Sequence, residues 1–373
     1  MKHALAMLFL VVLYLMVLFQ SHKEIFGYKF NSELISRYKL SQDIPHEVPG
    51  KRLFLSDSEI HIASGYLYVL GNNPTTFNFQ HPPFIKYLYG LSTLLFKNPF
   101  IIQIIFGIIL LFLTYKTSFL IFNSFLSALF STFLLLIDPL FIDISSQALL
   151  DLGQAVFIML YFYLLLKRKK INSIFPGIIL GILFASKFWT GSLFFVLIFD
   201  IYFILKKKLC LKDIAVHLIT SFIVFSIIYF KTFLDMKGLF NIIFFELKTI
   251  KYWLHHSTAS KFGSSIFLFL TGNFKSWWGN KTIIKSEVWS PLWPIVFILT
   301  SYRLVILLIK KKFNQEFLVS FIPVVYLIYL GVQAPFDRYF ILILPFFYII
   351  FTNLLISKLI FQIIKPENIQ LKK

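Results

Sequence analysis

The chain has 373 residues, of which 58% are hydrophobic and 14% are charged, and its formal net charge is +19. Soluble domains average about 45–50% apolar and about 25% charged residues, so this composition excludes an ordinary water-soluble domain. The basic residues form short clusters directly after apolar runs, at 167–170, 206–208 and 310–312. Membrane proteins keep such clusters in the cytoplasm, so the positive charge indicates membrane topology and argues against a nucleic-acid partner.

The apolar segment at 4–19 is the first predicted element. Its length suits the core of a signal peptide as well as a membrane helix, but no small-residue cleavage site follows it, so we expect an uncleaved first helix. The single cysteine, Cys210, follows a lysine cluster and leaves no pair for a disulfide or a Cys-based metal site.

Further apolar runs are long enough to cross a bilayer of about 30 Å. If every run crossed, however, the cluster at 167–170 would lie outside while Met1 stayed inside. The segment 82–97 is short, opens with two prolines and contains Lys86, which suits a helix that lies on the membrane surface. Counting that segment as interfacial, we predict an all-α polytopic membrane protein with both termini cytoplasmic and about ten spanning helices, at 4–19, 99–116, 119–137, 148–166, 172–189, 190–205, 213–233, 291–309, 317–333 and 340–361.

This topology treats 1–373 as a single transmembrane domain with two large external loops, at 20–98 and 234–290. Most of the 17 acidic residues then lie outside or at external helix ends, although they do not enter the topology assignment. A proton- or ion-coupled transporter more often places acids near the middle of the membrane. We therefore expect the chemistry at the external face, with the catalytic groups in the 20–98 loop.

The first candidate group begins a predicted helix in the 20–98 loop. Ser56 and Glu59 fit the S-x-x-E capping box, which gives Glu59 a structural role. Asp57 lies in the first turn, either as a charge that complements the helix dipole or as a functional acid. Further along, two prolines place His81 at the external membrane surface beside Lys86, at the depth of a lipid phosphate.

The second candidate group is an acidic cluster of Asp138, Asp143 and Asp151 near a predicted external helix junction. Three carboxylates at one place suit a divalent ion or sugar hydroxyls. Asp138 equally suits a turn ahead of Pro139. The sequence leaves these readings open, and it leaves metal binding undecided.

The third candidate group consists of cations that interrupt apolar runs. Lys187 lies near the external end of its predicted helix, and Arg338 begins the last one. Either side chain suits a phosphate, or it simply extends to the membrane interface; Asp337 is an alternative partner that would neutralise Arg338. In the second loop, Trp277 and Trp278 suit the interfacial aromatic belt, although indole rings also stack on sugars.

Several of these patterns follow one another in the order seen in a known superfamily. They are the acid motif at Asp57 with Gly-Asn-Asn-Pro at 71–74 and His-Pro-Pro-Phe at 81–84, Leu-Leu-Asp at 149–151, the segment 177–191 with Ser-Lys at 186–187, and Ser-Pro-Leu-Trp-Pro at 290–294. In this order the chain resembles the GT-C glycosyltransferases, closest to the dolichyl-phosphate-mannose–protein mannosyltransferase group and its aminoarabinose-transferase-like relatives. It departs from them where Ser58 separates two acids that the family usually has adjacent, in its uncharged residues 145–147, and in its shorter length.

The resemblance implies a GT-C-like bundle of about ten transmembrane helices with extracytoplasmic interfacial helices. It also implies the inverting transfer of a sugar, with a mannose-like hexose favoured, from a polyprenyl-phosphate carrier to an acceptor hydroxyl of a protein, glycan or lipid. The implied site is in the cell membrane of a prokaryote and faces outward. On this resemblance Asp57 is the expected base with Glu59 second, and the expected donor and phosphate contacts are His81, Lys86, Asp151, Lys187 and Arg338.

The sequence leaves alternatives open for both the cofactor and the class of function. No cofactor is certain, and a divalent metal, Mg²⁺ or Mn²⁺, stays open beside Asp151. A polytopic lipid or solute transporter is the rival reading, for which Asp200 is the best intramembrane acid. A non-catalytic membrane scaffold is a third, and it would leave the clustered external acids without a purpose.

Overall fold

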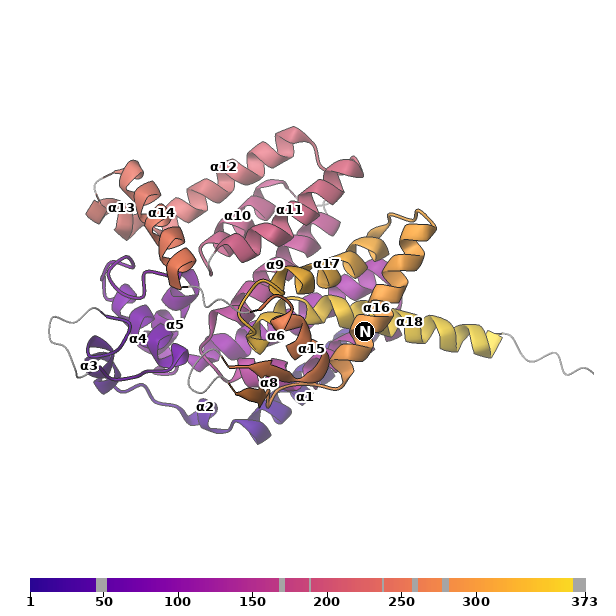
Figure 1. Ribbon diagram of the computed structural model, residues 1–373, viewed down its shortest axis with the longest axis horizontal. Helices are drawn as coiled ribbons and strands as arrows, with labels where there is room; N and C mark the ends of the chain where they lie inside the picture. Colours follow the sequence, from indigo (N-terminus) through magenta and orange to yellow (C-terminus); the bar gives the residue numbers. More distant parts are fainter. Residues whose placement is uncertain are drawn as a thin grey trace, which may run out of the picture.

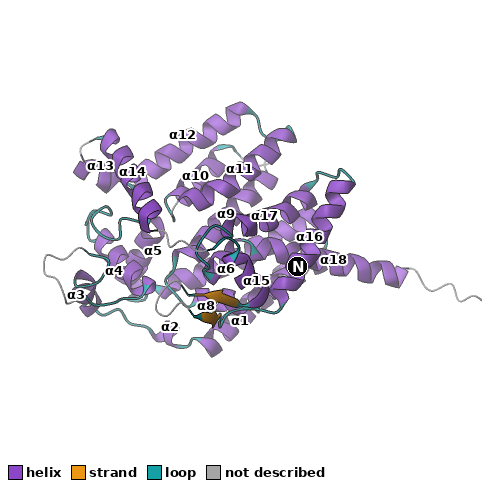
Figure 2. Cartoon of the chain, in the orientation of Figure 1, coloured by secondary structure: helices purple, strands orange, loops and turns teal. Residues whose placement is uncertain are grey.

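The apolar runs of the sequence form helices in the computed structural model, which describes residues 1–44, 52–167, 172–187, 189–236, 238–256, 261–276 and 282–364. Figure 2 shows helices along nearly all of the described chain, apart from one short two-stranded ribbon, which confirms the predicted all-α class. The helices are α1 Lys2–Ser21, α2 Glu24–Gly27, α3 Glu33–Lys39, α4 Asp57–Val69, α5 Phe84–Phe96, α6 Phe100–Phe122, α7 Phe125–Leu136, α8 Pro139–Ser145, α9 Leu150–Leu166, α10 Ile174–Phe184, α11 Trp189–Leu205, α12 Leu211–Ile228, α13 Phe230–Met236, α14 Leu239–His256, α15 Ser264–Thr271, α16 Leu292–Ile309, α17 Gln315–Leu330 and α18 Leu344–Ile364, with a 3₁₀ helix at Asp337–Leu342. The antiparallel ribbon pairs β1 Asn273–Lys275 with β2 Ile283–Lys285.

Each predicted crossing coincides with helical structure, but the helices differ in length. Within the described residues, four helices are long and apolar enough to span a membrane, namely α1, α6, α12 and α16. Helices α7 and α8 taken together are also long and apolar enough to span a membrane, although the chain bends by 63° at the break between them. Shorter apolar helices form at the remaining predicted crossings, so the chain is an integral membrane protein and the number ten stays a prediction.

The start of α1 and the end of α18 lie at one end of the molecule (Figure 1). There the Nδ1 atom of His3 lies 2.6 Å from the Tyr115 hydroxyl, and its ring packs edge-on against Phe119 and Phe125 at the α6–α7 turn. This arrangement agrees with the predicted topology, in which both termini and the α6–α7 turn lie on the cytoplasmic side.

Helix α9 is the centre of the bundle (Figure 1) and is buried on nearly every side. A helix that is apolar all round needs an apolar environment, which either lipid or neighbouring helices provide. Helices α6, α10 and α11 pack against α9, and so does the 3₁₀ helix Asp337–Leu342. The first turn of α9 therefore carries Asp151 into contact with residues from several distant parts of the chain.

The two helices of the first external loop pack backbone to backbone. A Cβ atom placed on Gly65 of α4 would lie 2.1 Å from the carbonyl oxygen of Lys86, and one on Gly90 of α5 would lie 2.0 Å from that of Gly65. No other residue type fits at such a distance. These glycines hold α5 against α4, beside the start of α4 where the acid motif lies.

The second external loop lies beside the first one. Helices α13 and α14 lie next to α4 and α5 in Figure 1. The Thr232 hydroxyl lies 3.2 Å from the side-chain oxygen of Asn73, and the rings of Phe79 and Phe245 pack edge to face with centroids 6.0 Å apart. The polar groups of the two predicted loops thus gather at one end of the bundle.

Candidate active site

The start of α4 has the predicted capping box. The Ser56 hydroxyl accepts a hydrogen bond from the Glu59 backbone N–H at 3.3 Å, and the Glu59 carboxylate accepts one from the Ser56 N–H at 2.9 Å. The Glu59 carboxylate also lies 3.3 Å from the Arg37 guanidinium. These contacts give Glu59 the structural role that the sequence indicates, while its catalytic role stays a prediction.

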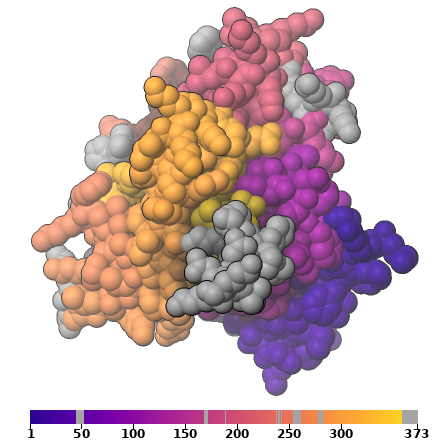
Figure 3. All heavy atoms as spheres, turned by 90° about the vertical axis from the view of Figure 1, so that its right-hand side faces the viewer, coloured from indigo at the N-terminus to yellow at the C-terminus, as the bar shows by residue number. Residues whose placement is uncertain are grey.

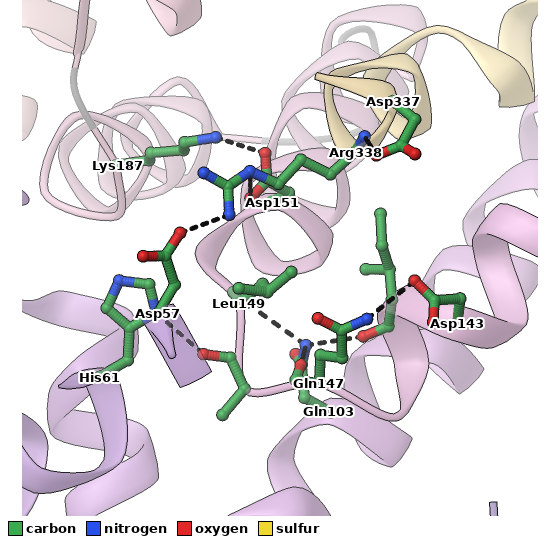
Figure 4. Close-up of polar contacts among 12 residues, drawn as sticks. Asp57, His61, Gln103, Asp143, Gln147, Leu149, Asp151, Lys187, Asp337 and Arg338 are labelled. Carbon is green, nitrogen blue, oxygen red and sulfur yellow. Dashed lines mark hydrogen bonds and ion pairs between the residues drawn. The ribbon is translucent and has the colours of Figure 1, made fainter. Parts of the chain in front are cut away.

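Asp57 projects from the same turn toward Arg338, which begins the 3₁₀ helix Asp337–Leu342. The Arg338 Nη1 atom donates to the Asp57 carboxylate at 2.6 Å, and its Nε atom lies 3.9 Å from the Asp151 carboxylate. Lys187, at the end of α10, donates to Asp151 as well. Figure 4 shows these four side chains, from four separate elements, meeting at one place with Arg338 between the two acids.

The four charges differ in their exposure to solvent. The Asp57 side chain is 54% exposed, whereas the Asp151 side chain is only 3% exposed. The Arg338 Nε–H is buried and has no hydrogen-bond partner among the described residues, since Asp151 lies beyond bonding distance. The site therefore combines a carboxylate open to a substrate with a half-buried cation whose buried Nε–H is an unused donor.

The electrostatics keep Asp57 ionised. Burial raises the pKa of its carboxyl, but the Arg338 guanidinium, together with His61 and Lys187, lowers it by more, so the net pKa is below the usual value. Burial lowers the pKa of Arg338, and Asp151 and the other nearby anions raise it by more, so the guanidinium stays charged. At neutral pH the acid is a carboxylate and can accept a proton.

His61, one turn after Asp57, ties α4 to the segment before α9. Its Nδ1 atom lies 2.9 Å from the Ala148 carbonyl oxygen, and the Ala148 N–H donates to the Ser58 hydroxyl at 2.9 Å. Burial lowers the pKa of His61 to about 4, so the ring is neutral and carries its proton on Nδ1, facing the carbonyl. The His81 ring packs edge-on against it with centroids 5.7 Å apart. Ser58, which interrupts the expected acid pair, thus fixes the distance between α4 and α9.

Lys86 is completely buried, and its ammonium is bonded within the first loop. Its Nζ atom lies 2.7 Å from the His81 carbonyl oxygen, 2.8 Å from that of Asn78 and 3.0 Å from the Tyr68 hydroxyl. Burial lowers the pKa of Lys86 to about 7, and Asp43 opposes this in part. These contacts make Lys86 an anchor for the loop that carries His81, and the predicted phosphate contacts of Lys86 and His81 stay untested.

One cavity reaches the charged residues, and a second lies at the start of α4. The first has a volume of about 100 Å³, reaches Lys187 and Tyr339, and is lined by Gln154, Tyr326 and Tyr329. The second has a volume of about 500 Å³ and is lined by the start of α4 and by residues 28–37 of the first loop. The small aromatic cavity thus borders the cationic side of the site, whereas the larger one has the capping-box residues Ser56 and Glu59 in its wall and not Asp57.

Comparisons with known proteins agree with this architecture. A sequence profile of the family described as dolichyl-phosphate-mannose-protein mannosyltransferase matches residues 80–230. The crystal structure of ArnT from Cupriavidus metallidurans bound to undecaprenyl phosphate superposes with a TM-score of 0.61 at 13% identity, over 86% of this chain and 58% of that chain. The chain has the GT-C glycosyltransferase fold. This confirms the resemblance seen in the sequence.

Other GT-C structures are similar as well. The archaeal oligosaccharyltransferase AglB from Archaeoglobus fulgidus, in complex with an inhibitory peptide and a dolichol-phosphate, superposes with a TM-score of 0.55 at 12% identity, over 98% of this chain and 52% of that chain. The oligosaccharyltransferase of the same organism tethered to an acceptor peptide gives a TM-score of 0.52 at 14% identity, over 89% and 50% of the two chains. No curated protein sequence matches the chain. The chain thus spans little more than half the length of these GT-C proteins.

The predicted acidic cluster separates in the GT-C fold. Asp138 caps α8 by accepting from the Leu140 N–H at 2.9 Å, and it accepts from the Trp293 indole at 2.8 Å and from the Tyr348 hydroxyl. Asp143 accepts from the Gln147 amide, and only Asp151 reaches the site. Within the described residues no three His, Cys, Asp or Glu side chains are arranged to hold a metal ion, and the possible divalent metal stays untested.

The alternative in which Asp337 neutralises the Arg338 guanidinium is wrong. The Asp337 carboxylate accepts from the Ser286 hydroxyl and from the Arg338 backbone N–H, both at 2.8 Å, while the guanidinium reaches Asp57 instead. Sequence reasoning also leaves out Tyr339, whose ring lies 4.5 Å from the Lys187 ammonium. Its position directly after Arg338 is the only sequence signal for it. Trp277 and Trp278 lie outside the described residues.

Proposed function

We propose that this chain is a membrane glycosyltransferase that moves a sugar from a polyprenyl-phosphate carrier to an acceptor hydroxyl, with inversion, on the extracytoplasmic face. One observation carries the proposal, namely that an exposed, ionised Asp57 is held 2.6 Å from Arg338, whose buried Nε–H keeps an unused donor. This reaction needs a base at the acceptor and a cation at the departing phosphate, on opposite sides of the anomeric carbon. The GT-C fold and the matching family profile support the same reaction class.

Asp57 takes the acceptor proton. As the acceptor oxygen attacks the anomeric carbon, the bond from that carbon to the phosphate oxygen breaks and its electrons pass to the phosphate. The proton of the acceptor hydroxyl goes to the Asp57 carboxylate, which its lowered pKa keeps ready as a base. Attack from the face opposite the phosphate inverts the configuration at the anomeric carbon.

Arg338 and Lys187 stabilise the departing phosphate. The guanidinium uses Nη1 for Asp57 and keeps further N–H groups in a planar fork that suits two phosphate oxygens. Lys187 contributes a second positive charge and is only 13% exposed, so water screens it little. Asp151 holds both cations in place from the first turn of α9, and in this role it positions the donor without touching it.

The two cavities suit a two-substrate reaction. The small cavity beside Lys187 is lined by tyrosines and by Gln154, groups that stack on and bond to sugar rings. The larger cavity at residues 28–37 and the start of α4 offers polar side chains such as Ser58 and Arg37, which suit an acceptor that approaches α4. We propose a mannose-like hexose as the sugar and protein Ser or Thr as the acceptor. The description of the matching family supports both.

A panel of donors tests the proposed reaction. Membranes that contain the chain are incubated with labelled polyprenyl-phosphate sugars, including mannose, glucose and aminoarabinose forms, and the products are separated and their anomeric configuration determined by NMR. We expect release of polyprenyl phosphate and a product of inverted configuration with at least one donor. A retained configuration contradicts Asp57 as a base acting on the acceptor.

The transporter alternative gains no support from the geometry. Its best acid, Asp200, accepts a hydrogen bond from the Tyr161 hydroxyl at 2.7 Å inside the bundle. This contact gives the carboxylate a structural partner, and the charged residues instead meet at Asp57 and Arg338. Enzymatic transfer therefore accounts for the observed charges better than transport does.

A further inference from the structure

The small cavity beside Lys187 lies at the outer end of α17. Helix α17 begins at the orange α16–α17 turn, on the face of the molecule that Figure 3 shows, and ends at Leu330, which lines the cavity. A helix of this length rises about 24 Å, so the cavity and that turn lie near opposite membrane faces. By the predicted topology the cavity is on the extracytoplasmic side, where the proposed transfer takes place.

Two buried polar groups of the cavity wall have no partner in the part of the chain that the structure describes. Gln154 of α9 and Tyr326 of α17 line the cavity and are 2% and 3% exposed. The Gln154 amide nitrogen donates to the Ser192 hydroxyl at 2.9 Å, which leaves the amide oxygen unused, and the Tyr326 hydroxyl bonds to no described residue. Since buried polar groups are nearly always hydrogen-bonded, these two groups indicate a polar ligand in the cavity.

Aromatic contacts hold the tyrosines of the wall in place. The Tyr326 ring packs against Phe194 and Phe195 of α11, with centroids 5.2 Å and 4.6 Å apart. The Tyr329 ring stacks on Phe194 as well, with centroids 5.2 Å apart. A rigid aromatic wall with a few fixed polar groups is the usual form of a site for a small molecule.

Gly191 lines the cavity between the two polar groups. A Cβ atom placed on Gly191 would lie 3.7 Å from the Gln154 amide nitrogen and 4.0 Å from the Tyr326 hydroxyl, which is ordinary contact without a clash. This Cβ would occupy space that the natural chain leaves open to a ligand. The cavity volume is about 100 Å³, whereas sites for drug-sized ligands have about 300–1,000 Å³, so one added methyl group changes what the cavity admits.

The only charged side chain in the wall is Lys187. None of the described residues that line the cavity is acidic, and Asp151, which pairs with Lys187, does not line it. An ammonium group in the cavity would therefore be buried without a carboxylate partner, which is costly, whereas hydroxyl groups would bond to the amide and the phenol. A sugar whose phosphate contacts Lys187 enters this space directly, because the cavity reaches that lysine.

We propose that this cavity binds the donor sugar, with Gln154 and Tyr326 bonding its hydroxyl groups and Gly191 leaving room for its ring, and that it thereby selects a neutral hexose over an amino sugar. The inference rests on the proposed transfer reaction and adds the residues that choose the sugar. The lipid phosphate stays with Lys187 and Arg338, so separate groups bind the sugar and the phosphate.

The variant Gly191→Ala separates sugar binding from phosphate binding. Alanine favours a helix more than glycine does, so this variant should fold at least as well as the natural chain. We expect its kcat/KM for the neutral hexose donor to fall by about tenfold or more, as for one methyl group in a specificity pocket. Its inhibition by sugar-free polyprenyl phosphate should stay within about twofold of the natural value, because the phosphate contacts are unchanged.

The control is Gly27→Ala in α2, where an added Cβ meets nothing within 4 Å. We expect both its kcat/KM and its inhibition to stay within about twofold of the natural values. An unchanged kcat/KM in Gly191→Ala, or an equal loss of inhibition by polyprenyl phosphate, overturns the sugar assignment.

The variant Tyr326→Phe tests the proposed hydrogen bond. Because the hydroxyl bonds to no described residue, its removal should leave the melting temperature unchanged, and we expect kcat/KM for the hexose donor to fall by about three- to tenfold. A natural kcat/KM in this variant refutes the contact between Tyr326 and the sugar.

Donor choice by the natural chain completes the test. We expect neutral hexose donors to give a kcat/KM at least about tenfold above that of the aminoarabinose donor, because the wall offers an ammonium group no carboxylate. Equal use of both donors, or preference for the amino sugar, overturns the proposed selection. Absence of transfer from every donor contradicts the proposed function and this inference with it, whereas normal transfer by Gly191→Ala contradicts this inference alone.

Discussion

Replacing Arg338 by Lys tests how the site holds its base. The change keeps a positive charge but removes the planar fork that bonds Asp57 at 2.6 Å while its Nε faces Asp151 at 3.9 Å. A hydrogen bond to a charged group contributes about 1.5–3 kcal/mol, or about ten- to a hundredfold in rate. In the proposed reaction the same fork also bonds the departing phosphate, and the transition state loses one such bond because a Lys ammonium cannot replace the fork toward both Asp57 and the phosphate. We expect kcat/KM to fall by about ten- to a hundredfold.

The pH profile separates this effect from a general loss of structure. The Asp57 pKa is held below its usual value because Arg338 and its neighbours outweigh burial. A base works only above its pKa, so the natural enzyme loses activity at low pH, as the pH falls through that lowered value. Weakening the Arg338 contact raises the Asp57 pKa, and the acidic limb of kcat/KM moves to higher pH.

The control is Arg303→Lys, because Arg303 makes a bond of similar length, 2.7 Å, to Glu316 at the far end of the bundle. We expect the control to keep its activity within about twofold, as for a contact between partly exposed charges far from the reaction. The assay is the initial rate of sugar transfer from the active donor, measured from about pH 3, below the usual pKa of an aspartate, to about pH 9. A fall in kcat/KM with no movement of the acidic limb would refute the role of Arg338 in setting the Asp57 pKa.

Two further substitutions address the scaffold of the site. Gly65→Ala places a Cβ 2.1 Å from the Lys86 carbonyl oxygen, and overpacking of this kind costs about 1–3 kcal/mol or more. We therefore expect a lower melting temperature in a thermal unfolding assay. An unchanged melting temperature would show that α4 and α5 can separate at no cost. Lys187→Gln leaves the Asp151 carboxylate, which is only 3% exposed, without its nearest cation. Removing one partner of a buried ion pair costs about 3–5 kcal/mol of stability, so we expect loss of both stability and transfer. The double change with Asp151→Asn should restore stability but not transfer, and restoration of both would place Lys187 outside the chemistry.

Local sequence signals predict the local parts of the structure well. The Ser56–Glu59 capping box follows from a four-residue pattern, because both of its hydrogen bonds lie within one helical turn. The all-α class follows from composition and from the apolar runs. The order of the motifs is sufficient to identify the GT-C resemblance, which needs the sequence of patterns along the chain and no distances between them.

These local signals do not predict contacts between residues that are far apart in the sequence. Asp57 and Arg338 are 281 positions apart, and Asp337 next to Arg338 is the partner that local reasoning favours. The packing of the 3₁₀ helix against α9 decides between them. The acidic cluster shows the same limit, since Asp138 is bonded by Trp293 and Tyr348 from distant parts of the chain, while Asp151 lies in the first turn of α9. Helix lengths also differ from the apolar runs, because capping and turns end a helix before hydrophobicity does.

The central claim is that Asp57 is the base, and a matched pair of variants tests it most directly. Asp57→Asn keeps the shape of the side chain and removes the carboxylate, whereas Glu59→Gln makes the equivalent change two residues later in the capping box. Sugar transfer by both variants is measured with the active donor in membranes that contain equal amounts of inserted protein. We predict that Asp57→Asn lowers kcat at least about a hundredfold, as expected for loss of a general base, and that Glu59→Gln keeps most of the activity. Retained transfer in Asp57→Asn, with loss in Glu59→Gln, would contradict the assignment.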